Sequence, residues 1–140
     1  MKVAVDTNVI LDVLLYRAPH VKSSKAIMWA AERGEINGLL CATTITTIDY
    51  FLSKQLGKRE SVRVINELLS VFEIAPVNRS VLQSALEITL HYFEDAVLTS
   101  AAQQCGAELI VTRNTKDFAG CALKILTPDE WVVVQNLRLR

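Results

Sequence analysis

The fold is indicated by a short stretch near the start of the chain, Val3-Ala4-Val5-Asp6-Thr7-Asn8-Val9. Its apolar residues run without alternation and end at an acid, which is typical of a buried strand followed at once by a turn. Similar runs recur at Leu39-Leu40-Cys41-Ala42, Leu109-Ile110-Val111-Thr112 and Leu123-Lys124-Ile125-Leu126. Glu73-Ile74-Ala75-Pro76-Val77 predicts a further short strand, which its proline restricts to the edge of a sheet.

Helices are predicted between these strands. Capping residues and helix-stopping glycines place them at about 9–15, 24–33, 44–57, 59–72, 80–91 and 94–105, and Pro128 opens a short terminal helix. Alternating strands and helices with continuous apolar strands favour an α/β fold built on a parallel sheet.

Composition bounds the class of protein. The 140 residues are half hydrophobic, which fits one domain over 1–140 with a sizeable core. Fifteen basic residues balance fifteen acidic ones, so no overall positive field draws the chain onto nucleic acid. No apolar run is long enough for a membrane span, and Asp6 interrupts any signal peptide, so we expect a cytoplasmic protein. Three widely spaced cysteines are predicted to be small hydrophobic residues, Cys41, Cys105 and Cys121.

Asp6 stands directly after the first predicted strand. Ligands of open α/β sheets bind outside the carboxyl ends of the strands, where the strand order reverses, so this position favours a functional acid. An alternative is that Asp6 only caps the helix that follows, which an Asp-Thr-Asn sequence does well.

Asp49 lies on a predicted core-facing stripe formed by Ile45, Ile48, Leu52 and Leu56. A carboxylate buried there has to be neutral, ion-paired or metal-bound. The alternative is an acid at the edge of the stripe that reaches solvent or a salt bridge.

Two more acids occupy comparable positions. Asp95 is in the first turn of a predicted helix and shares a face with Leu98 and Ala102, so it points inward. The helix dipole alone also explains first-turn acids such as Glu94. Asp117 belongs to the stretch 112–118 that follows a strand, where Asn and Asp are ordinary turn residues.

The four acids gain meaning in combination. A parallel sheet brings the ends of its strands to one edge, and two helices can deliver Asp49 and Asp95 there. Clustered carboxylates repel one another, and a divalent cation or a bound proton relieves that repulsion. Oxygen ligands suit Mg²⁺ or Mn²⁺ rather than zinc. His20 and His91 have no partner at a ligand spacing, so we predict structural or surface roles for both.

Three motifs resemble those of the PIN-domain family, and within it the VapC-like toxin ribonucleases. They are the opening strand with Asp6-Thr7-Asn8, the Phe93-Glu94-Asp95-Ala96 segment, and Thr112-Arg113-Asn114-Thr115-Lys116-Asp117-Phe118. They come in the family's order and spacing, over nearly the whole chain. The resemblance implies a three-layer α/β/α sandwich with a central, mostly parallel sheet. It also implies an endoribonuclease that depends on Mg²⁺ or Mn²⁺.

Residue roles follow from this resemblance. Asp6, Asp95 and Asp117 are implied as metal ligands, and with Asp49 as catalytic acids; Asp49 or Asp117 is a candidate to orient the attacking water. Asn8, Thr112 and Asn114 are implied as substrate-binding residues. Many members have a Glu where Asp49 stands, whereas others place the polar residue earlier, near Thr47. The implied partners are an RNA substrate, a cognate antitoxin protein and a second copy of the chain in a homodimer.

Other functions stay open at this point. A PIN domain can act as a non-catalytic RNA- or protein-binding module, or in RNA processing outside a toxin–antitoxin pair. An aspartyl phosphotransferase is disfavoured because its second acid is replaced by Asn8. Candidate phosphate-binding residues are Lys54, Lys58, Arg59, Arg63, Arg113 and Lys116, with a solvated surface as the alternative.

Overall fold

The computed structural model describes residues 1–138. Its strands are β1 (Lys2–Val5), β2 (Asn37–Cys41), β3 (Glu73–Ala75), β4 (Leu109–Val111) and β5 (Lys124–Leu126). Its helices are α1 (Thr7–Leu14), α2 (Val21–Glu32), α3 (Ala42–Leu56), α4 (Lys58–Val71), α5 (Arg79–Glu87), α6 (Phe93–Gln104) and α7 (Pro128–Arg138), with a 3₁₀ helix, η1 (Thr115–Phe118).

All strands join one parallel sheet in the order β3-β2-β1-β4-β5. The chain extends the sheet from β1 to β3 on one side and from β4 to β5 on the other, so the strand order reverses between β1 and β4. These two strands are paired, with Val5 opposite Val111. The residues that follow them, Asp6 and Thr112, therefore leave the sheet side by side at the point where α/β proteins bind ligands.

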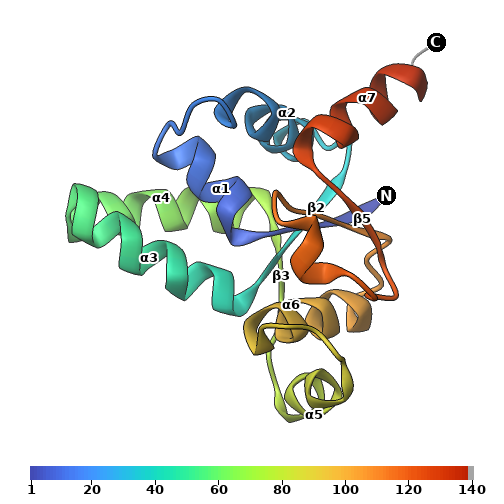
Figure 1. Cartoon of the computed structure of the whole chain (residues 1–140). Coiled ribbons are helices and arrows are strands. Elements are labelled where there is room, and N and C mark those ends of the chain that lie inside the picture. The colour runs from blue at the N-terminus through green and yellow to red at the C-terminus, as the bar shows by residue number, and fades with distance from the viewer. Residues whose placement is uncertain (139–140) are drawn as a thin grey trace.

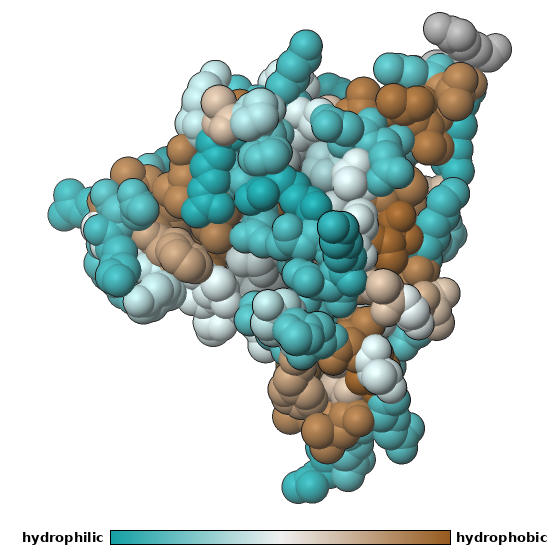
Figure 2. All heavy atoms as spheres, viewed as in Figure 1, coloured by the Kyte–Doolittle hydropathy of each residue, from teal (hydrophilic) through white to brown (hydrophobic). Residues whose placement is uncertain are grey.

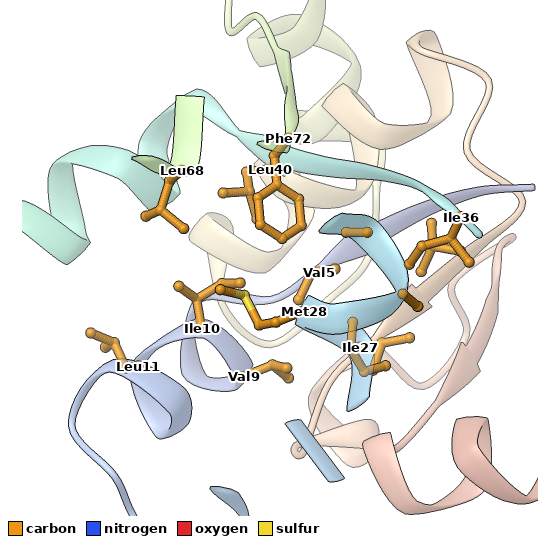
Figure 3. Close-up of a cluster of buried hydrophobic side chains, with 14 of the residues drawn as sticks. Val5, Val9, Ile10, Leu11, Ile27, Met28, Ile36, Leu40, Leu68 and Phe72 are labelled. Atoms are coloured by element: carbon orange, nitrogen blue, oxygen red, sulfur yellow. The ribbon is translucent and has the colours of Figure 1, made fainter. Parts of the chain in front are cut away.

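Alternation of side chains along the strands divides the core between the two faces of the sheet. Val3 and Val5 point to a cluster shared with α1, α2, α3, α4 and α7, whereas Ala4 points to a second cluster shared with α5 and α6. Figure 3 shows the first cluster, where Val5 of the sheet faces Ile27 and Met28 of α2. In Figure 1 α5 and α6 lie below the sheet and α1 and α2 above it. The predicted three-layer α/β/α sandwich is confirmed.

Most predicted elements are present within a few residues of their expected bounds, and β3 lies at the sheet edge as Pro76 predicts. The expected helix over 80–91 is shorter and ends at Glu87. It ends there because Ile88 adopts an extended backbone and packs, with Leu90, against the second core cluster. Residues 115–118 form a 3₁₀ turn that was not predicted.

Other expectations concern single side chains. Cys41, Cys105 and Cys121 are free thiols, and His20 and His91 are exposed. Within residues 1–138, no helix has both the length and the apolar character that crossing a membrane requires.

Candidate active site at the carboxyl edge of the sheet

Asp6 is held rigidly at the reversal point of the sheet. Its carboxylate accepts a hydrogen bond from the backbone N–H of Thr7 at 2.8 Å and another from the hydroxyl of Thr112 at 2.7 Å. Its backbone N–H donates to the carbonyl of Val111. Asp6 caps α1 while lining a cleft, so the two sequence interpretations of this residue are compatible.

Thr112 differs from its predicted role. It was expected to bind substrate, but its side chain is fully buried and has no surface to offer a ligand. Its hydroxyl donates to Asp6 and accepts a hydrogen bond from the backbone N–H of Asn114 at 3.0 Å. Thr112 is therefore a positioning residue, which fixes both Asp6 and the start of the loop that leads to Asp117.

The cleft has a volume of about 430 Å³ and draws its walls from several elements. The turn after β1, the start of α6 and the segment after β4 bring Asp6, Asp95 and Asp117 to it. The other lining residues are Thr7, Asn8, Leu11, Thr47, Phe51, Tyr92, Phe93, Glu94 and Asn114. The structure thus brings together Asp6, Asp95, Asp117, Asn8 and Asn114 from the predicted site.

The carboxylates of this cleft destabilise one another's charged forms. Asp95 is half-buried, and desolvation followed by repulsion from Asp6, Asp117 and Glu94 raises its pKa to about 7. Burial also raises the pKa of Asp6, although hydrogen bonds from Thr112 and Thr7 oppose this shift. Such mutual perturbation at a concave site is characteristic of functional carboxylates.

The donor set is suited to a hard divalent cation. Carboxylate oxygens line the cleft with the amide side chains of Asn8 and Asn114, and Mg²⁺ and Mn²⁺ prefer oxygen ligands. Across residues 1–138, no three His, Cys, Asp or Glu side chains are already arranged to hold a metal ion. The acids share a cleft and repel one another, and the charge of a bound cation would relieve that repulsion.

Asp49 does not belong to this group. Its carboxylate accepts hydrogen bonds from Ser61 of α4 at 2.7 Å and from Ser53 at 3.1 Å, and lies 3.7 Å from Nζ of Lys58. These partners, Ser61 first, lower the pKa of Asp49. The side chain is 37% exposed, so the interpretation as an acid at the edge of the stripe is correct.

The face of α3 that meets the cleft carries Thr47 and Phe51 instead. They stand four residues apart and so project from the same side of the helix. The Thr47 hydroxyl donates to the carbonyl of Thr43 at 3.1 Å. The alternative second-motif position near Thr47 is thus the one that lies in the cleft, and it supplies a hydroxyl rather than an acid.

Arg113, a candidate phosphate ligand, is committed to another contact. It donates two hydrogen bonds to Asp12, which is completely buried in α1. Asp12 was missed by sequence reasoning, although an acid inside the apolar run 9–15 is a usable signal. The other candidate cations include Lys58, paired with Asp49, and Arg63, paired with Glu60 and Glu67.

Comparisons with known proteins agree with this fold. Residues 2–116 match the family model described as PIN domain. Ribonuclease VapC1 of Aquifex aeolicus (strain VF5) is 29% identical over 135 residues, which cover 93% of this chain and 92% of that protein.

Solved structures share the fold. FitAcB from Neisseria gonorrhoeae has a TM-score of 0.70 and 20% identity, covering 90% of this chain and 97% of that chain. A toxin-antitoxin complex from Klebsiella pneumoniae has a TM-score of 0.68 and 21% identity, with the same coverage of 90% and 97%. The family match spans most of the sequence and includes the turn after β1, the start of α6 and the strand β4, so this chain belongs to the PIN domain family.

Proposed function

We propose that this chain is a metal-dependent endoribonuclease and the toxin of a toxin–antitoxin pair. The observation that carries the proposal is the convergence of Asp6, Asp95 and Asp117 on one cleft where the strand order reverses, with the pKa of Asp95 raised to about 7. The name of the Aquifex relative, a ribonuclease, supports the reaction, and the titles of the structural neighbours support the biological setting.

Asp6, Asp95 and Asp117 would hold Mg²⁺ or Mn²⁺ through their carboxylate oxygens. A bound divalent cation lowers the pKa of a coordinated water and neutralises charge that develops on a phosphodiester. Thr112 keeps Asp6 oriented through its hydroxyl. Asn8 and Asn114 offer amide groups to the phosphate or ribose, and Asp117 is a candidate to accept the proton of the attacking water.

A cognate antitoxin and a homodimer are part of the same proposal. Several structural neighbours are titled as toxin complexes, including VapBC2 from Rickettsia felis bound to a promoter DNA fragment. This chain exposes large apolar side chains on which protein partners could pack, among them Trp29, Val133 and Leu137.

Growth of a bacterial host tests the proposal in a cell. Expression of the wild-type chain without a partner should slow growth and produce RNA fragments with discrete ends. Asp6→Asn should restore growth at equal protein level, and Glu108→Gln, which removes an exposed acid that does not line the cleft, should not. Toxicity that persists in Asp6→Asn would instead favour a non-catalytic binding module.

A further inference from the structure

The acidic cleft lacks the charge that usually attracts RNA. Its lining contains Asp6, Glu94, Asp95 and Asp117, and none of the lining residues described within 1–138 is a lysine or an arginine. RNA phosphates gain affinity mainly from basic side chains. Neighbouring carboxylates repel them, and the chain as a whole has no net charge. Affinity for RNA at this cleft must therefore include contacts to something other than the backbone phosphates.

Aromatic rings stand at the cleft in place of cations. Tyr92 and Phe93 line it and are 52% and 51% exposed, and Phe51 of α3 lines it as well. Tyr92 and Phe93 come directly before Glu94 and Asp95 at the start of α6. The Tyr92 ring packs edge-to-face on the His91 ring, with 4.4 Å between the ring centroids, and this contact supports the Tyr92 side chain. Two large aromatic side chains are thus kept in solvent beside the proposed reaction centre.

The apolar surface continues beyond Phe93. A second hollow of about 490 Å³ shares Phe93 with the cleft and is otherwise lined by Val77, Asn78, Arg79, Leu82, Gln83 and Leu86. Figure 2 shows hydrophobic surface gathered over α5, at the bottom of the view. Arg79 is exposed and forms no salt bridge with any residue in 1–138. Phe93 therefore separates an acidic cleft from an apolar hollow that carries one cation.

We infer that Tyr92 and Phe93 form a stacking platform that binds an unpaired base of the substrate next to the scissile phosphate. The inference rests on the proposed nuclease function. Flat aromatic faces bind unstacked bases, whereas the bases of a duplex are already covered on both faces. The hollow beyond Phe93 takes the neighbouring nucleotide, with Arg79 placed near its phosphate.

Direct binding tests the platform independently of cleavage. The probe is a fluorescently labelled oligoadenylate with nuclease-resistant phosphorothioate linkages, and its Kd is measured by anisotropy in Mg²⁺. We expect Tyr92→Leu/Phe93→Leu to raise Kd on the order of 10-fold. Tyr92→Phe and Phe93→Tyr, which keep the rings, should stay near the wild-type value. Tyr92 caps α6 without a side-chain hydrogen bond, so these changes remove no cap.

Tyr50→Leu is the matched control, because Tyr50 is an exposed tyrosine of α3 that does not line the cleft. Pairing the probe with a complementary strand should weaken binding and abolish the difference between wild type and the double variant. The inference is overturned if the wild type does not bind the single strand, if it binds the duplex equally well, or if the leucine variants keep the wild-type Kd. In the last case the rings serve another partner, such as a peptide. Loss of RNA cleavage in Asp6→Asn tests the nuclease function separately.

Discussion

Arg113 donates two hydrogen bonds to the carboxylate of Asp12, from Nε to Oδ2 at 2.6 Å and from Nη2 to Oδ1 at 3.1 Å. Asp12 is 0% exposed and lies in α1, whereas Arg113 directly follows Thr112 in the segment that leads to Asn114. Nη1 of Arg17 lies 3.8 Å from Oδ1 of Asp12 and adds a second ion pair. The pair therefore ties α1, which begins next to Asp6, to the segment that carries Asp117.

Breaking this pair should cost much of the stability of the protein. Asp12→Ala leaves the guanidinium of Arg113 without its buried partner, and we expect the free energy of unfolding to fall by about 3–5 kcal/mol. Urea denaturation measures the change. Arg63→Ala removes exposed pairs with Glu60 and Glu67 and should cost about 1 kcal/mol or less. Equal losses in the two variants would show that the buried pair does not stabilise the fold.

Asp95 should make the metal-free protein less stable as the pH rises. Its pKa is about 7 in the folded chain, well above the 3.8 of an ordinary aspartate side chain, so the folded state holds the proton more tightly. The stability that this proton contributes is fully present below about pH 4 and is lost as the pH rises through 7.

Asp95→Asn is uncharged at every pH and should remove this dependence. With chelator present, the variant should be more stable than wild type at pH 8 by on the order of 1 kcal/mol, a value reduced for solvent screening. The difference should become smaller at pH 5. If the free energies of unfolding of the two proteins differ by the same amount at pH 5 and pH 8, the raised pKa of Asp95 is contradicted.

Mn²⁺ or Mg²⁺ should raise the melting temperature, because a ligand that binds only the folded state stabilises it. The increase should be larger at pH 8 than at pH 6, since the cation displaces the proton of Asp95. Thermal shift assays in both metals test this. An equal increase in Asp6→Asn/Asp95→Asn would place the binding site elsewhere.

Asp49 offers a test of which acids form the site. Asp49→Asn should keep RNA cleavage close to the wild-type rate, because its carboxylate bonds to Ser61 and Ser53 and does not line the cleft. It should lower stability slightly, since the contact with α4 is weakened. A large loss of cleavage at unchanged stability would return Asp49 to the catalytic group.

These residues also show what sequence alone can predict. Asp6, Asp95 and Asp117 were predicted to lie together because each stands near the end of a strand or the start of a helix, and because each matches a PIN-domain motif position. Backbone topology alone also placed Asp49 in this group, which the structure does not support. Strands β1, β2 and β4 were predictable because they are buried on both faces and lack alternation.

Side-chain partners from distant segments were not predictable. Asp49 neighbours the buried Ile48 on the helical stripe, and only the packing of α4 against α3 decides that Ser61 satisfies it. Arg113 was a candidate phosphate ligand. Its actual partner, Asp12, is 101 residues away in the sequence, so the pairing could not be predicted. Thr112 matched a substrate-binding position in the motif. In the structure its side chain is buried, and its hydroxyl donates a hydrogen bond to Asp6.

Cleavage of RNA by the purified chain in Mn²⁺, before and after Asp95→Asn, tests the proposed function most directly. The substitution removes one carboxylate charge with little change in shape. We predict cleavage by the wild type and a loss on the order of 100-fold or more in the variant, which should keep its fold. Cleavage by folded Asp95→Asn at the wild-type rate would contradict a nuclease centred on these acids.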